Sequence, residues 1–145
     1  MQDSNSGKLK LERDAQHAIL LHFGALPWVR IWRQNTGKAY GYSIVAGAIG
    51  QMKNGNFRAG YDLLKHAQLT TYGTPGSADI QGLLGPRTGS NGGRFLAIEV
   101  KGAQGVQSDE QIAWQAMIEA KGGIYILAKT VEDVQVALRG YGYPA

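Results

Sequence analysis

The sequence predicts an α/β fold in which a mixed β-sheet is covered by helices. Some stretches repeat apolar residues every three or four positions, which is typical of helices that pack on a core. Others are apolar at every second position or throughout, which is typical of strands. Along the chain the order is helix, strands, helix, strand, helix, which favours a mixed sheet. A chain of 145 residues is long enough to bury a real core.

The first helix is expected over residues 9–24. Ala15, Ile19 and Phe23 recur there at a spacing of four, so they share one face. The next stretch, VRIWRQN at 29–35, alternates between apolar and polar residues and predicts a strand.

Two segments carry less regular patterns. Residues 1–7 are polar and lack periodicity, so we expect a disordered tail followed by a single domain over 8–145. Residues 37–60 contain six glycines and the turn pair Asn54-Gly55, which indicates a loop or a loose hairpin. Residues 61–69 fit a short helix or a strand equally well.

The second half of the chain predicts three strands. The stretches DIQGLL at 79–84 and RFLAIEVK at 94–101 are joined by the turn-rich connection 85–93. A third strand is expected at 124–128, where the sequence reads IYILA.

Two capping signatures start the remaining helices. Ser108 is followed three residues later by Gln111, which predicts a capping box and a helix over 108–121. Thr130 followed by Asp133 is a second signature of the same kind and begins the last helix.

Composition excludes several kinds of chemistry. The chain has no cysteine, so disulfides, thiolate nucleophiles and cysteine zinc sites are excluded. Its three histidines lack zinc-ligand spacing. No stretch approaches the roughly 20 apolar residues of a membrane span, and no signal peptide opens the sequence. We therefore expect a cytoplasmic protein of a bacterial cell or a phage-infected host. The net charge of +4 suits a polyanionic partner, so we also expect it to associate with the nucleoid.

Two carboxylates carry the argument for a site. Glu99 and Lys101 are two apart, so they share a face of an otherwise apolar strand. If the two strands form a hairpin centred on its connection, Leu84 lies opposite Arg94 and Asp79 lies opposite Glu99. Opposed like charges destabilise a sheet unless a cation lies between them. Lys101 is one such cation, and Mg²⁺, which needs only one or two carboxylates plus water and phosphate oxygens, is another.

A structural alternative explains the same residues. Asp79 then caps a turn, while Glu99 and Lys101 form a partly exposed ion pair that contributes little. The hairpin register decides between the two readings, because a slip of one residue places Asp79 on the other face.

The pattern of Asp79 followed by Glu99-x-Lys101 at the end of an apolar strand resembles the PD-(D/E)XK nuclease superfamily. Four segments in order, ERDAQ, GTPGSADIQGLL, FLAIEVKG and QSDEQIAWQAMIEAKGGIYILA, resemble the VRR-NUC family of virus-type replication and repair nucleases. The resemblance covers most of residues 11–138 apart from 37–60. One departure is Ala78, which stands where the family has a proline before its aspartate. Because a metal needs the carboxylate and not the proline, the departure concerns the stiffness of the loop.

The resemblance implies a mixed central sheet flanked by helices and a metal-dependent endonuclease. It implies that Asp79, Glu99 and the Val100 carbonyl hold Mg²⁺ or Mn²⁺, with Lys101 orienting the attacking water. It further implies that Gln111 lines the site and that Glu12 approaches from the first helix and contributes to the metal site. Both have a second reading from the residues themselves.

The alternatives for Glu12 and Gln111 stay open at this point. Glu12 lies in the first turn of its predicted helix, where a carboxylate suits the helix dipole. Gln111 completes the capping box of Ser108 and also shares a face with Trp114 and Ile118, which directs it at the sheet.

The resemblance also implies the partners: branched DNA such as four-way (Holliday) junctions, cut by a homodimer. Six basic residues between the first helix and Asp79 are candidate phosphate contacts, and a solvated basic loop explains them as well: Arg30, Arg33, Lys38, Lys53, Arg58 and Lys65. Trp28, Trp32 and Tyr40 are candidates for base stacking, although the alternation around Trp32 favours packing in the core. Candidate dimer faces are the Gly-rich segment and the GYGYPA tail. The alternatives to a junction nuclease are a non-catalytic DNA-binding module and a sequence-specific, restriction-type nuclease.

Overall fold

The chain forms two compact units. The computed structural model describes residues 4–87 and 92–145. The larger unit combines Met1–Gln34 with Pro75–Ala145, and the smaller unit comprises Asn35–Thr74. The prediction of a single domain over 8–145 did not anticipate this division. The middle of the predicted connection, residues 88–91, and the first three residues of the predicted tail lie outside the described residues.

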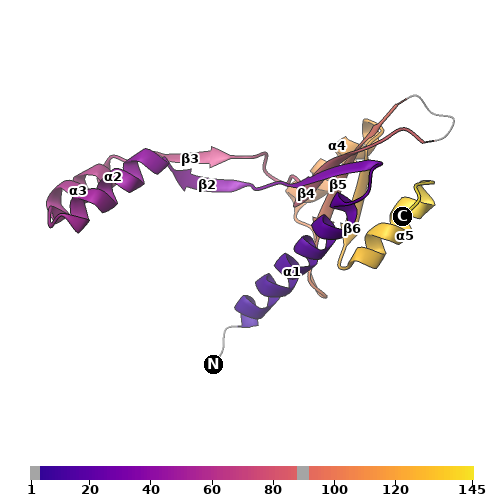
Figure 1. Cartoon of the computed structure of the whole chain (residues 1–145), viewed down its shortest axis with the longest axis horizontal. Helices are drawn as coiled ribbons and strands as arrows, with labels where there is room; N and C mark the ends of the chain where they lie inside the picture. The colour runs from indigo at the N-terminus through magenta and orange to yellow at the C-terminus, as the bar shows by residue number, and fades with distance from the viewer. Residues whose placement is uncertain (1–3, 88–91) are drawn as a thin grey trace. The chain divides into compact units, whose positions relative to one another are not determined.

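The larger unit is built on a four-stranded mixed sheet (Figure 1). Its strand order is β1 (Val29–Arg33), β4 (Ile80–Leu84), β5 (Arg94–Val100) and β6 (Ile124–Ala128). The first three strands pair antiparallel, whereas β5 and β6 run parallel because the chain returns through a helix between them. The expected α/β class with a mixed sheet is confirmed.

Helices pack against both faces of this sheet. The helices α1 (Ser4–Gly24) and α5 (Val131–Gly140) lie on one face, where Ile19, Phe23 and Leu138 are fully buried against the strands. On the other face, α4 (Asp109–Ala120) packs against β6 over a smaller apolar cluster that includes Ala97 and Tyr125. Successive residues of β5 therefore meet two different cores, which explains why neither face of this strand is polar.

The hairpin register is the expected one. Leu84 pairs with Arg94 and Ile80 pairs with Ile98, so the continuation of the ladder places Asp79 opposite Glu99. The one-residue slip that would separate the two acids does not occur.

Both capping boxes are present. The Ser108 hydroxyl accepts a hydrogen bond from the Gln111 backbone, and the Thr130 hydroxyl accepts one from that of Asp133.

The structure differs from the prediction at the start of the first helix. The first helix begins at Ser4, so residues 4–7 of the expected disordered tail are helical. Once the packed part of a helix has formed, each further residue that joins it adds one hydrogen bond.

The smaller unit corrects the expectation of a loop over 37–60. The strands β2 (Gly37–Tyr40) and β3 (Leu69–Tyr72) form an antiparallel ribbon, and α2 (Tyr42–Lys53) and α3 (Phe57–Lys65) lie between them in sequence. A Cβ on Gly60 would lie 2.9 Å from the Ala48 carbonyl oxygen, so this glycine permits close contact between helices and does not mark a loop. Of the ambiguous residues 61–69, 61–65 end α3, 66–68 connect the two elements and Leu69 begins β3.

The aromatic side chains differ from the prediction in which of them are buried and which are exposed. Trp28 packs on the core and stacks on Tyr143 at 5.6 Å between ring centroids, as expected for a packing role. The expected burial of Trp32 is wrong, because 39% of it is exposed. Val29 and Ile31 occupy the buried face of β1, and alternation turns Trp32 the other way. Tyr143, in the tail considered as a dimer face, is buried in the core.

Within residues 4–87 and 92–145, none of the helices has the length and apolar character that crossing a bilayer requires.

Candidate active site

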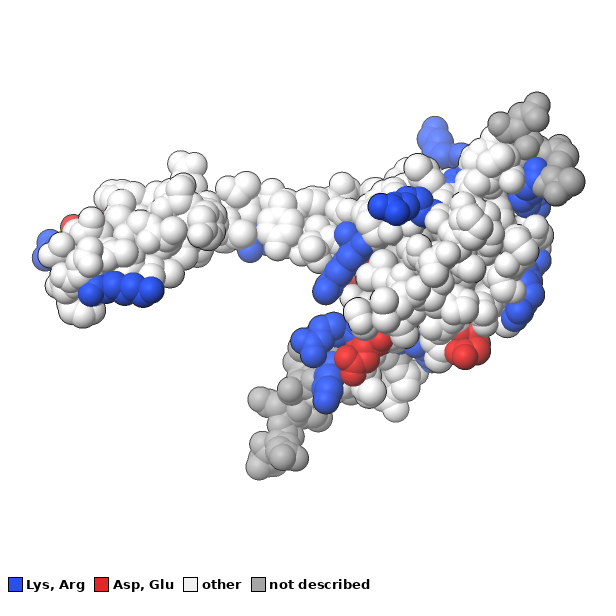
Figure 2. Space-filling model, viewed as in Figure 1, with Lys and Arg blue, Asp and Glu red and all other residues white. Residues whose placement is uncertain are grey.

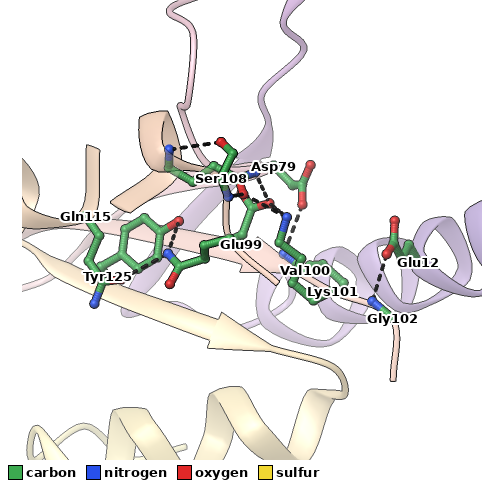
Figure 3. A network of polar contacts seen from close by, with 11 residues as sticks. Glu12, Asp79, Glu99, Val100, Lys101, Gly102, Ser108, Gln115 and Tyr125 are labelled. Atoms are coloured by element: carbon green, nitrogen blue, oxygen red, sulfur yellow. Dashed lines mark hydrogen bonds and ion pairs between the residues drawn. The ribbon is translucent and has the colours of Figure 1, made fainter. Parts of the chain in front are cut away.

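Asp79 and Glu99 converge where β4 begins and β5 ends (Figure 3). An Oδ2 atom of Asp79 accepts a hydrogen bond of 2.9 Å from the backbone N–H of Val100, the residue after Glu99. The charge of Asp79 raises the pKa of Glu99, which places the two carboxylates within electrostatic range of each other. The antiparallel register thus brings together two acids that are 20 positions apart in the sequence.

Glu99 is the most buried charged group of the site, with 2% of its surface exposed. Its Oε1 atom lies 2.9 Å from the Lys101 ammonium and also accepts a hydrogen bond from the Gln111 side-chain amide. Its other oxygen, Oε2, is buried and accepts no well-formed hydrogen bond from the described residues, although the Asp79 backbone N–H is near enough to the carboxylate to lower the pKa of Glu99. A buried carboxylate oxygen without a well-formed hydrogen bond is costly, so it is a ready position for a cation or a water molecule.

Lys101 closes a triangle with Glu99 and Gln111. Its Nζ atom donates a hydrogen bond of 2.8 Å to Gln111 Oε1, and only 14% of its side chain is exposed. The structural alternative, a partly exposed ion pair that contributes little, fits this burial poorly.

Gln111 fulfils both of the roles left open for it. Its Oε1 atom accepts the backbone N–H of Ser108 at 3.0 Å, which completes the capping box. The same side chain reaches Glu99 and Lys101. The first turn of α4 is therefore fixed to the site by the residue that caps it.

Glu12 reaches the edge of the site from α1. Its Oε1 atom accepts a hydrogen bond of 2.8 Å from the Gly102 backbone, and its charge raises the pKa of Asp79 (Figure 3).

Among residues 4–87 and 92–145, no three acidic or histidine side chains form a ready-made metal cluster. The carboxylates of Asp79 and Glu99 thus supply the principal side-chain oxygen atoms that could bind a metal ion.

A tight loop places Asp79 beside α4. Gly76 has a φ of +76°, and a Cβ there would lie 2.3 Å from the Glu110 carbonyl oxygen. Only glycine fits both the backbone conformation and the close approach. Ala78, where the resembling family has proline, is fully buried in the cluster under α4, so packing holds this loop.

Both convergent acids have raised pKa values. Burial is the largest cause for Asp79, partly offset by the Val100 hydrogen bond and by the charge of Lys101. Burial is also the largest cause for Glu99, followed by the charge of Asp79. The folded chain therefore holds two carboxylates that a cation would stabilise in their ionised form.

Sequence reasoning missed a second polar group on the same face. Tyr125 of β6 pairs with Ala97, two residues before Glu99, and its hydroxyl accepts a hydrogen bond of 3.4 Å from Gln107. Gln107 also donates to Gln115 at 3.0 Å. Burial and the charge of Glu99 raise the pKa of Tyr125 to about 12, so it stays protonated. IYILA reads as apolar, and only the β5–β6 register reveals that Tyr125 shares the face of Glu99.

The basic residues named from the sequence do not all belong to the unit that holds the site. Arg30 and Arg33 are on β1 of the larger unit, and the charge of Arg33 lowers the pKa of Asp79. The other four belong to the smaller unit: Lys38, Lys53, Arg58 and Lys65.

The residues at the site fit a hard divalent cation. Mg²⁺ prefers oxygen ligands and is commonly held by one or two carboxylates together with water and phosphate oxygens. Asp79 and Glu99 supply two carboxylates, one of which has an oxygen without a well-formed hydrogen bond among the described residues. The donor set therefore has the right chemistry for such an ion.

No protein-family model, curated protein or solved structure matched the chain in the three comparisons.

Proposed function

We propose that this protein is a PD-(D/E)XK nuclease of the VRR-NUC type, a metal-dependent DNA endonuclease. The observation that carries the proposal is the group of Asp79, Glu99 and Lys101, in which the Glu99 carboxylate is buried and one of its oxygens lacks a well-formed hydrogen bond among the described residues. Ion pairs that serve stability alone are seldom left with an unsatisfied buried oxygen. The resemblance of four ordered sequence segments adds to this support.

The proposed metal ligands are Asp79 and Glu99 with the carbonyl of Val100, and Glu12 stands at the edge of the site. A bound Mg²⁺ or Mn²⁺ would supply activation of water at neutral pH and neutralise charge that grows on the phosphate.

The remaining roles belong to the side chains of the chain itself. Lys101 carries a positive charge to the position where phosphodiester hydrolysis develops negative charge. Gln111 holds the Lys101 ammonium and the Glu99 carboxylate in one arrangement through two hydrogen bonds. The Val100 backbone fixes one oxygen of Asp79.

The proposed substrate is branched DNA such as a four-way junction. The net charge of +4 favours a polyanion. No predicted element resembles a helix that reads bases, which favours recognition of DNA shape over sequence.

We also propose a homodimer, whose two sites would cut symmetric strands of a junction. The support is the smaller unit, in which only Ala48 and Gly60 of its two helices are buried. Several large apolar residues of that unit are exposed, and units of about 40 residues commonly need a partner surface: Tyr42 at 88%, Phe57 at 68%, Tyr61 at 61% and Ile49 at 48%.

The test is cleavage of a labelled four-way junction by the purified chain with Mg²⁺, and with chelator in its place. We expect cleavage only with the metal. We expect Glu99→Gln and Lys101→Ala each to lower the cleavage rate by at least about 100-fold, because each removes charge from the reacting centre. Junction affinity measured in chelator should change little.

Matched controls are Glu132→Gln and Lys121→Ala, which make the same charge changes on exposed residues and should leave cleavage intact. Metal-independent binding without cleavage would identify a non-catalytic DNA-binding module instead. Cleavage of linear duplex at one sequence would identify a restriction-type enzyme.

A further inference from the structure

The larger unit has a pocket that is lined mostly by charged and polar side chains. It has a volume of about 320 Å³ and lies between α1 and the end of β1. Five of its lining residues come from α1 and one from β1: Arg13, Asp14, Gln16, His17, Leu20 and Arg33. A volume near the lower limit of ligand sites suits a small group such as a phosphodiester with its waters.

Two uncommitted guanidinium groups line this pocket. Among the described residues, Arg13 and Arg33 form no hydrogen bond or ion pair. Three other arginines of the same unit are already occupied, because they donate to backbone carbonyl oxygens: Arg87, Arg94 and Arg139. The lining contains one carboxylate, that of Asp14, and two guanidinium groups, so its formal charge is positive. Figure 2 shows basic side chains gathered over α1, with acidic side chains among them.

The pocket also contains an amide that is not used by the fold. The Oε1 atom of Gln16 is buried without a hydrogen-bond partner among residues 4–87 and 92–145. Rotation of this amide by 180° turns its N–H donors to the same position. An anion in the pocket would thus find two guanidinium groups and one amide donor.

The backbone connects this pocket to the active-site carboxylates. Arg13 follows Glu12, whose carboxylate accepts the Gly102 N–H at the end of β5. Arg33 pairs with Ile80, the residue after Asp79, and the next backbone N–H, that of Gln34, donates to the Asp79 carbonyl at 2.7 Å. The charge of Arg33 lowers the pKa of Asp79, so one guanidinium group of the pocket lies within electrostatic range of that carboxylate.

We propose that the pocket is a phosphate subsite, in which Arg13 and Arg33 hold a backbone phosphodiester of the DNA near the cleaved bond. This inference rests on the proposed function for the identity of its ligand. Guanidinium groups match phosphate oxygens with paired hydrogen bonds. A phosphate of the strand that enters the active site is the proposed occupant, because Arg33 lies within electrostatic range of Asp79.

The first experiment measures junction binding by the full chain in chelator at several salt concentrations. Each phosphate contact contributes about 0.9 to the slope of log affinity against log salt concentration. Because Arg13 and Arg33 are proposed to contact the same phosphate, the double variant Arg13→Gln with Arg33→Gln should reduce that slope by about 0.9 and weaken binding at least about tenfold. With Mg²⁺, its cleavage should show a raised KM and a kcat within about threefold of wild type, because the lost contact is made equally in the ground and transition states.

The control is Lys121→Gln, which removes an exposed charge at the C-terminal end of α4. The neighbouring Gly122 carbonyl accepts a hydrogen bond from Arg94 at the start of β5, whereas the site lies where β5 ends. It should change the slope by less than about 0.3, as expected for a residue without a phosphate contact. A double variant that behaves like this control while wild type cleaves DNA would overturn the subsite and leave the proposed function standing.

A second readout is independent of DNA cleavage. Inorganic phosphate is added to the chain in chelator, and the side-chain Nε–H resonances of the arginines are followed by NMR. Saturable shifts at Arg13 and Arg33, but not at Arg94, support the subsite even if no nuclease activity is found. Equal, non-saturating shifts at all arginines would refute it.

Discussion

Asp79 and Glu99 are held in the fold at an energetic cost. Their pKa values are raised chiefly by burial, so the folded state binds protons more tightly than the unfolded state does. Between the ordinary pKa values, 3.8 and 4.5, and the raised values, the folded state carries more protons. The free energy of unfolding contributed by these two groups therefore decreases as pH rises through that interval.

This sign predicts the effect of removing one charge. Asp79→Asn keeps an oxygen that can accept the Val100 N–H but has no ionisable group. Above the raised pKa, the metal-free variant should melt roughly 2 to 4 °C higher than wild type, and the difference should vanish near pH 4. Thermal unfolding in chelator across pH 4 to 8 measures it.

The same variant tests the metal site. Mg²⁺ should raise the melting temperature of wild type, since a ligand that binds only the folded state stabilises it. It should leave Asp79→Asn unchanged. Equal stabilisation of both proteins would contradict the assignment of Asp79 as a ligand.

The two capped helices α4 and α5 offer a controlled comparison. Both begin with a capping box, but only Gln111 of α4 also contacts the site, whereas Asp133 of α5 bonds the backbone of Lys129 and Thr130 alone. The helix that contacts the candidate site and the helix that does not thus begin with the same capping motif.

We predict that Gln111→Ala and Asp133→Ala each lower the free energy of unfolding by about 0.5 to 2 kcal/mol, the usual cost of a lost cap. Only Gln111→Ala should impair junction cleavage, by about tenfold or more, because Lys101 loses a hydrogen-bond acceptor. Urea unfolding and cleavage rates at one temperature separate the two effects. Similar cleavage by both variants would restrict Gln111 to its capping role.

The candidate site and the two helices with exposed apolar residues belong to different units of the molecule. Every side chain proposed for the site lies in the larger unit, and the smaller unit is a continuous segment. The N–H of Gln34 donates to the Asp79 carbonyl at 2.7 Å, so the chain leaves and re-enters the larger unit at nearby positions.

We predict that replacing residues 35–74 with a linker of about four Gly and Ser residues leaves the larger unit folded, because a linker of that length spans up to about 14 Å. The shortened chain should be monomeric, whereas the full chain should be a dimer. Light scattering after gel filtration gives the mass, and circular dichroism reports the fold. A shortened chain that still dimerises would place the dimer contact in the larger unit.

Features that depend on neighbours in sequence were predictable. The boxes at Ser108 and Thr130 and the strands of the central sheet follow from local hydrogen bonding and side-chain alternation, which act over a few residues. The pairing of Asp79 with Glu99 was also within reach, because a hairpin centred on its connection fixes which residues lie opposite each other.

Tertiary structure alone decided what depends on distant packing. Trp32 alternates like a core residue, yet α1 covers the other face of β1. The glycines of 37–60 allow helices to approach closely, which composition cannot distinguish from a loop. The dual role of Gln111, the presence of Tyr125 on the face of Glu99 and the pocket of Arg13 and Arg33 arise where separate elements meet. Local sequence determined the elements of the larger unit and the acidic pair, whereas burial, and with it charge and access, was set by contacts between residues far apart in the chain.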